Sequence, residues 1–138
     1  MKLLDTTFLA HYYRGNDRVE QFLSERDDGD AEPEDLVTTT INLKEITVGL
    51  HAIGEDPTTA QFRSELGWLQ IVPFEPAHAV EAAALEAQLH ADESINQDRI
   101  NSLGGDLLIA GAAESLDATV VTDNVADFEA LDVAVETY

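Results

Sequence analysis

The chain has 138 residues, 44% of them hydrophobic, and its 28 acidic side chains against 7 basic ones give a formal net charge of -21. The length suits one compact domain over residues 1–138, and the absence of cysteine excludes a disulfide framework, a zinc–thiolate site and a cysteine nucleophile. Lys2 and Asp5 interrupt the first apolar residues, and no run reaches the roughly 18 apolar residues of a spanning helix, so we expect a soluble, cytoplasmic protein without membrane contact.

The acidic composition bears on the choice of partners. Phosphate binding relies on Lys and Arg, so the net charge of -21 taken alone argues against a nucleic-acid ligand. Adaptation to a salt-rich interior explains the same composition, because an acidic surface stays soluble there while the Debye length falls to about 3 Å at 1 M salt. We therefore expect a halophilic protein, and we interpret the acidic stretch from Asp27 to Asp35 as a solvated loop.

Short apolar runs alternate with longer helical patterns, which is typical of an α/β domain with a mostly parallel sheet. The predicted strands are Lys2–Leu4, Leu36–Thr39, Gln70–Val72, Thr119–Val121 and Val133–Val135. The predicted helices are Thr7–Arg14, Asp17–Glu25, Ile41–Ile53, Thr58–Trp68, Ala77–His90 and Gly105–Leu116. The clearest helical pattern has Val80, Leu85 and Leu89 recurring among alanines, which favour helix.

Asp5 directly follows the first predicted strand and precedes a helix. Ligands of open α/β sheets bind at this end of a strand, so the Asp5 carboxylate is a candidate site residue. Capping of the following helix explains Asp5 equally well, and Thr6 or Thr7 would serve as caps too.

Glu45 stands about one turn into the predicted helix Ile41–Ile53, which follows the second predicted strand. We expect its apolar neighbours to form the buried side of that helix: Leu43, Ile46, Leu50 and Ile53. Glu45 then lies on another side, which faces either solvent or the mouth of the sheet, and Gly49 leaves open space beside it.

Asp106 begins a helix so apolar that it must pack mostly inside the domain. A carboxylate there gains from the positive end of the helix dipole, and a plain capping role after two glycines would also account for it. The next strand ends in Thr122-Asp123-Asn124, which would bring further oxygen ligands to the same edge of the sheet.

Two or three carboxylates that converge without a cation repel one another. Mg²⁺ or Mn²⁺ resolves this conflict, since hard cations take oxygen ligands and the four histidines show no paired ligand spacing. We therefore expect metal-dependent hydrolysis of phosphodiesters, in which Asp5 and Asp106 hold the metal, the metal activates water, and Glu45 orients that water or binds a second ion.

Several stretches, in order along the chain, carry a resemblance to a known family. They are Leu4-Asp5-Thr6, Glu45-Ile46-Thr47-Val48-Gly49, Pro73-Phe74-Glu75-Pro76, Asp106 with Ile109-Ala110 and Ala113, and Thr122-Asp123-Asn124-Val125-Ala126-Asp127-Phe128. In these stretches the chain resembles the PIN-domain ribonucleases and, within that family, the small VapC-type toxins of toxin–antitoxin pairs. The likeness spans nearly the whole chain.

The resemblance implies a three-layer α/β/α fold with strand order 3-2-1-4-5. It also implies an endoribonuclease that depends on Mg²⁺ (or Mn²⁺), a homodimer, and inhibition by a cognate antitoxin protein. Asp5, Glu45 and Asp106 match three acidic positions of the family pattern.

The fourth acidic position of the family is matched less directly. The family has Asp or Asn two residues after a Thr, and here that residue is Asn124, with Asp123 before it and Asp127 just ahead of Phe128. We predict Asp127 as the fourth catalytic carboxylate and Asn124 as a supporting ligand.

Three other functions are weighed against a nuclease. A PIN-like domain that has lost catalysis would bind partners without cutting RNA. A receiver-type signalling domain needs a late Lys, and no basic residue follows Arg99. A haloacid-dehalogenase-like phosphatase needs Asp-x-Asp after the first strand, where this chain has Asp5-Thr6-Thr7. We therefore expect a metal-dependent endoribonuclease, the toxin of a toxin–antitoxin pair.

Overall fold

Five parallel strands form the central sheet, in the order β3-β2-β1-β4-β5. The computed structural model describes residues 1–26 and 35–138, so most of the predicted acidic loop lies outside the described residues. The strands are β1 Lys2–Leu4, β2 Leu36–Thr39, β3 Gln70–Val72, β4 Thr119–Val121 and β5 Val135–Glu136. The parallel α/β class and the strand order agree with the prediction.

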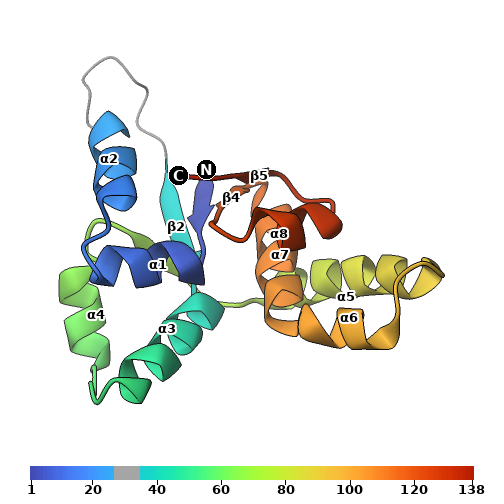
Figure 1. Ribbon diagram of the computed structural model, residues 1–138, viewed down its shortest axis with the longest axis horizontal. Helices are drawn as coiled ribbons and strands as arrows, with labels where there is room; N and C mark the ends of the chain where they lie inside the picture. The colour runs from blue at the N-terminus through green and yellow to red at the C-terminus, as the bar shows by residue number, and fades with distance from the viewer. Residues whose placement is uncertain (27–34) are drawn as a thin grey trace.

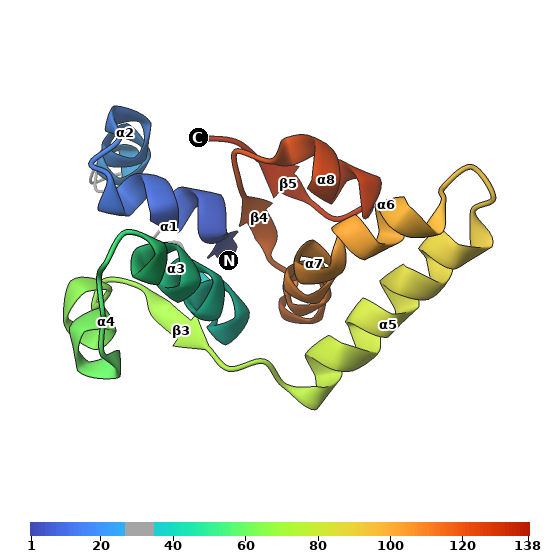
Figure 2. The same ribbon diagram turned by 60° about the horizontal axis from the view of Figure 1, so that its bottom comes forward.

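The two faces of the sheet are covered by separate groups of helices. Leu3 and Leu4 of β1 are both fully buried, but Leu3 belongs to one core cluster and Leu4 to the other, because successive residues of a strand point to opposite faces. The Leu4 side is covered by α1 Thr6–Tyr13, α2 Asp17–Arg26, α3 Thr40–Ala52 and α4 Thr59–Glu65. The Leu3 side is covered by α5 Pro76–Ala91, α6 Gln97–Ser102, α7 Gly104–Leu116 and α8 Val125–Ala130. Figures 1 and 2 show these two groups on either side of the strands.

Helices α5 and α7 approach each other so closely at Gly111 that no side chain larger than that of glycine fits between them. A Cβ atom added at Gly111 would lie 2.6 Å from the Cβ and the backbone nitrogen of Ala82. Leu85 and Leu89 of α5 are buried against this side, whereas Val80 is 69% exposed and lies on the outer side of the helix. The close contact holds α5 against α7 along the edge of the molecule (Figure 2).

The structure corrects the sequence-based elements in four places. Helices α6 and α8 have six residues each, too few to show a periodic apolar pattern, and both were missed. The last strand begins at Val135, because Asp132 takes a left-handed turn (φ 55°) and Val133 is buried ahead of the strand. Helix α4 ends at Glu65, short of Trp68. Ile53 follows the end of α3 and is 74% exposed, so it is not part of the buried side of that helix.

No helix in residues 1–26 and 35–138 combines the length and the apolar character that crossing a membrane requires.

Candidate active site

Asp5 lies where β1 ends, and its carboxylate is fixed by three hydrogen bonds. Oδ1 accepts from the backbone N–H of Phe8 (3.1 Å) and from the hydroxyl of Thr7 (2.7 Å), and Oδ2 accepts from the hydroxyl of Thr122 (2.6 Å). Asp5 is therefore the cap of α1, and Thr6 and Thr7 are not. A carboxylate has about four lone-pair sites, so one remains for another partner.

The same carboxylate is only 3% exposed, and burial raises its pKa above the usual 3.8. The hydrogen bonds from Thr122, Thr7 and Phe8 oppose that shift, because they favour the charged form. Thr7 also accepts a hydrogen bond from the backbone N–H of Asp123 (2.9 Å). The start of α1 and the end of β4 are thus locked together around Asp5.

Glu45 faces the mouth of the sheet, one of the two positions that the sequence left open for it. Its Oε1 accepts a hydrogen bond from the hydroxyl of Thr6 (2.8 Å), and Thr6 in turn accepts one from the Asn42 side chain (3.1 Å). Asn42 is fully buried and forms a capping box with Thr39 at the start of α3. The other Glu45 oxygen, Oε2, lies 2.9 Å from where a Gly105 Cβ would be, so only glycine leaves it this space.

Thr6 and Asn42 position Glu45, and neither was predicted to do so from the sequence. A signal for Asn42 was present, since a threonine followed three residues later by a residue with a side-chain oxygen is a helix-start pattern. For Thr6 the only signal was its place next to Asp5.

Asp106 lies in the first turn of α7 and is half-buried. Its pKa is raised to about 6, first by burial and then by the negative charges of Asp127, Asp5 and Glu45, in that order. The positive charge of Arg99 acts in the opposite direction. Asp5, Glu45 and Asp127 therefore all lie within electrostatic reach of Asp106, although the four acids come from four separate parts of the chain.

Asp127 and Asn124 lie beside this group. Asp127 Oδ1 accepts from Nη2 of Arg99 (2.7 Å) and Oδ2 accepts from the Asn124 side chain (2.6 Å), and both hydrogen bonds hold the pKa of Asp127 below its usual value. The backbone N–H of Asn124 donates to Thr122 (2.9 Å), which connects the pair to Asp5. Arg99 was not among the residues predicted for the site.

Asp123, which the sequence left open as a further ligand, points elsewhere. Its carboxylate pairs with Nη1 of Arg18 on α2 at 3.1 Å, and this hydrogen bond lowers its pKa. The structure thus brings Asp5, Glu45, Asp106 and Asp127 together and turns Asp123 away from them.

The donor set suits a hard divalent cation. The charged oxygens of the group are all carboxylate oxygens. Burial, and after it the charges of Asp127, Asp5 and Glu45, disfavours the ionised form of Asp106, and a bound cation would favour that form. As the side chains stand, no three acidic or histidine side chains within the described ranges 1–26 and 35–138 form a closed set of metal ligands. Mg²⁺ does not need one, because it usually keeps several waters and binds one or two carboxylates.

A parallel sheet in the order 3-2-1-4-5 with carboxylates gathered where its strands end defines the class of this domain. The model of the PIN domain family matches residues 2–133, and the chain belongs to that family. The resemblance seen in the sequence is confirmed.

Solved structures share the fold over nearly the whole chain. VapBC2 from Rickettsia felis, bound to a DNA fragment from the promoter, is similar at 20% identity over 99% of this chain and 98% of that chain, with a TM-score of 0.74. FitAcB from Neisseria gonorrhoeae is similar at 27% identity over 98% and 96%, with a TM-score of 0.67. VapBC-5 from Mycobacterium tuberculosis, of the VapBC family of toxin-antitoxin systems, reaches 28% over 99% and 95%, with a TM-score of 0.58. A comparison with curated proteins gave no match.

Proposed function

We propose that this PIN domain is a metal-dependent endoribonuclease and the toxin of a toxin–antitoxin pair. The observation that carries the proposal is the half-buried Asp106 carboxylate, whose pKa is raised to about 6 by burial and by the charges of three other acids. Proteins avoid such a group or relieve it with a cation, and a cation held by carboxylates is the usual means of phosphodiester hydrolysis.

The residues of the chain take separate parts in this reaction. Asp5 and Asp106 would hold the ion, Mg²⁺ or Mn²⁺, which when bound would supply a Lewis acid that activates water and offsets charge on the phosphate. Asp5 is kept in place by Thr7 and Thr122, so its free lone pair has a fixed direction. Glu45, which accepts a hydrogen bond from Thr6, would orient the attacking water.

Two observations support an antitoxin partner: similar solved structures are toxin-antitoxin complexes, and this chain has an apolar groove on its surface. The similar structures include a toxin-antitoxin complex from Klebsiella pneumoniae. On this chain a groove of about 430 Å³ runs between α1, α3 and α4, with apolar walls that include Ile46, Leu50 and Ile53 and with Glu55 and Glu65 at its sides. Such a groove suits an apolar antitoxin segment that also carries basic residues.

The test is RNA cleavage in KCl at about 1 M, where charge repulsion is screened. Wild-type protein with Mn²⁺ or Mg²⁺ should cut RNA, and Asp106→Asn or added EDTA should abolish cutting. Glu114→Gln is the matched control, because Glu114 is an exposed acid farther along α7, and this variant should cut like the wild type. Equal cutting by wild type, Asp106→Asn and the EDTA sample would exclude the metal mechanism, and no cutting by any sample would favour a binding domain without catalysis.

A further inference from the structure

The geometry points to Arg99, with Lys44 on the other side of α7, as the residues that bind phosphate groups of RNA on either side of the acidic site. This inference rests on the proposed function and deepens it. It answers a question that the composition raises, namely how a chain with a net charge of -21 holds a polyanion next to four carboxylates.

Five of the seven basic side chains either pair with an acid outside the site or lie on other parts of the surface. Lys2 and Arg26 both pair with Glu136, and Arg18 pairs with Asp123. Arg14 lies at the end of α1, where it lines the groove between α1, α3 and α4, and Arg63 is exposed on α4. Lys44 and Arg99 remain, from α3 and α6, two of the helices that contact α7.

Arg99 is held at the acidic site by a contact that leaves most of its donors available. Its Nη2 donates to Asp127 (2.7 Å) and its Nη1 lies 3.4 Å from the hydroxyl of Ser102, while 42% of the side chain is exposed. A guanidinium has five N–H donors in a planar fork, an arrangement that fits two oxygens of one phosphate. The free edge of Arg99 can therefore bind a phosphate while the other edge stays on Asp127.

Asp127 is then the positioning residue of Arg99. Both of its carboxylate oxygens are engaged, one by Arg99 and the other by Asn124. The chain Thr122, Asn124, Asp127, Arg99 connects the end of β4 with α6 through three hydrogen bonds. The guanidinium thus has a fixed place relative to Asp5, which Thr122 also holds.

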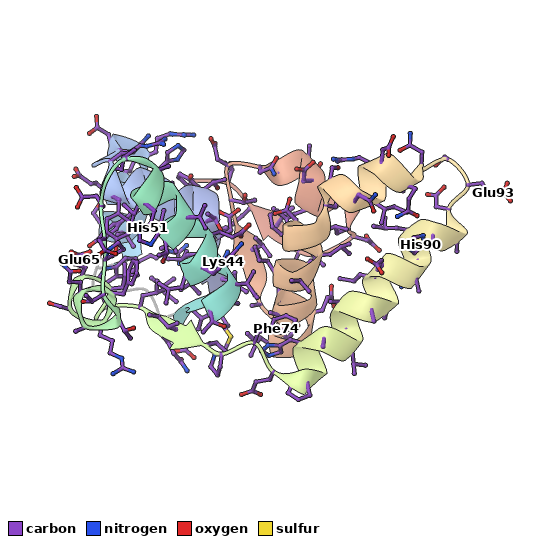
Figure 3. The ribbon with its side chains drawn as sticks, turned by 90° about the horizontal axis from the view of Figure 1, so that it is seen from below. Lys44, His51, Glu65, Phe74, His90 and Glu93 are labelled. Carbon is purple, nitrogen blue, oxygen red and sulfur yellow. The ribbon has the colours of Figure 1, made fainter. Side chains whose placement is uncertain are left out.

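Lys44 lies on the other side of α7. It is exposed and directly precedes Glu45 on α3. Ile41, one turn earlier, packs against the core cluster of α5 and α7, so Lys44 is on the same side of α3. Figure 3, which views the domain from the side toward which β1 and β2 run in Figure 1, shows Lys44 on the side of α3 toward α7.

The experiment measures RNA binding as a function of salt. The parent is Asp106→Asn, which the proposed function makes unable to cut, and the probe is a fluorescent single-stranded RNA titrated with protein at several KCl concentrations. Each phosphate contact on a single strand contributes about 0.7 to the slope of log affinity against log salt. Adding Arg99→Gln or Lys44→Gln should therefore reduce the slope by about 0.7 and weaken binding about fivefold at about 0.1 M KCl, with the difference vanishing near 1 M.

Two further variants make the outcome specific. Arg63→Gln, which also removes one exposed positive charge, should leave the slope unchanged, and Arg99→Lys should keep the slope because it keeps the charge. The ion pair of Arg99 is on the surface and worth at most about 1 kcal/mol, so these variants should stay folded, which thermal melting checks.

The inference is overturned if Arg99→Gln and Arg63→Gln behave alike, or if the parent does not bind RNA. Cleavage by wild-type protein combined with an unchanged slope for Arg99→Gln would refute this inference alone. Absence of metal-dependent cleavage would refute the proposed function whatever the slopes are.

Discussion

At the scale of single residues, Asp5 combines two roles that the sequence presented as alternatives. It caps α1 through the backbone N–H of Phe8, and it faces the other acids of the site. Capping alone would not require the two threonine hydroxyls that also bind its carboxylate. The cap therefore fixes the direction in which the carboxylate presents its remaining lone pair.

Asp5→Asn should keep the fold and lose RNA cleavage. Asparagine is as good a cap as aspartate and keeps a carbonyl oxygen for Phe8, so the free energy of unfolding should fall by less than about 1 kcal/mol. Asp5→Ala should lose about 1–2 kcal/mol, because the cap is absent and the N–H of Phe8 is unpaired. Denaturant unfolding of both variants in the same KCl buffer makes the comparison, and equal losses would show that the charge and not the cap stabilises α1.

The stability of the metal-free protein should fall between about pH 4 and pH 6 on account of Asp106. Its pKa rises from 3.8 to about 6 on folding, so between these two pH values the unfolded chain has already released the proton that the folded chain still holds. The free energy of unfolding therefore falls as the pH rises through this range and is constant above it. Screening of this half-exposed group leaves about 1 kcal/mol of the full effect. Asp106→Asn should accordingly melt at a higher temperature than wild type at pH 7 without divalent ions, and at the same temperature near pH 4.

Addition of Mg²⁺ is the control for this pH effect. The ion should raise the melting temperature of the wild type and leave Asp106→Asn nearly unchanged. If wild type were more stable than Asp106→Asn at pH 7 in EDTA, burial and the neighbouring acids would not destabilise the Asp106 carboxylate.

Asp5, Glu45 and Asp106 were predictable because each stands beside a strand or at a helix start whose own pattern is clear. Asp127 was predicted as the fourth carboxylate from the family resemblance, because local pattern alone does not separate it from Asp123: both follow β4 and both suit a solvated turn. What separates them is their partners, Arg18 from 105 residues away and Arg99 from 28 residues away. Such pairs depend on how α2 and α6 are placed, which local pattern does not encode.

At the scale of secondary-structure elements, two helical glycines offer a matched test of packing. Gly111→Ala places a methyl group against the backbone of Ala82 and should cost about 1–3 kcal/mol, because α5 and α7 must move apart. Gly49→Ala meets nothing within 4 Å and should gain about 0.5–1 kcal/mol, since glycine is a poor helix former. Chemical unfolding measures both, and a neutral result for Gly111→Ala would mean that α5 adjusts freely.

The sequence predicted the first four strands because each is a short apolar run between turns. It predicted the long helices to within a few residues, because their apolar side chains recur at helical spacing. It missed α6 and α8 because a helix of six residues completes fewer than two turns. Helix α6 carries Arg99, so the one charged neighbour of the acidic group that sequence reasoning missed lies on a helix that it also missed.

At the scale of the whole molecule, the net charge of -21 makes stability depend on salt. Repulsion among the acids opposes the compact state, and screening reduces it as the Debye length shortens from about 10 Å at 0.1 M salt to about 3 Å at 1 M. The melting temperature at pH 7 should therefore rise steadily between about 0.1 M and 1 M KCl. The same series near pH 4, where many carboxylates are protonated, should show a smaller rise; equal rises at both pH values would point to a general salting-out effect instead.

The central place of β1 in the sheet has a consequence for how the protein is made. The contact between Asp5 and Thr122 joins residues 117 positions apart, and β1 pairs with β4 as well as with β2. A growing polypeptide on the ribosome holds Asp5 and Glu45 long before it holds Asp106, and one side of β1 has no partner strand until β4 Thr119–Val121 has been made. We therefore expect the acidic site to assemble only after the ribosome has made β4, so that shorter nascent chains hold its residues without its geometry.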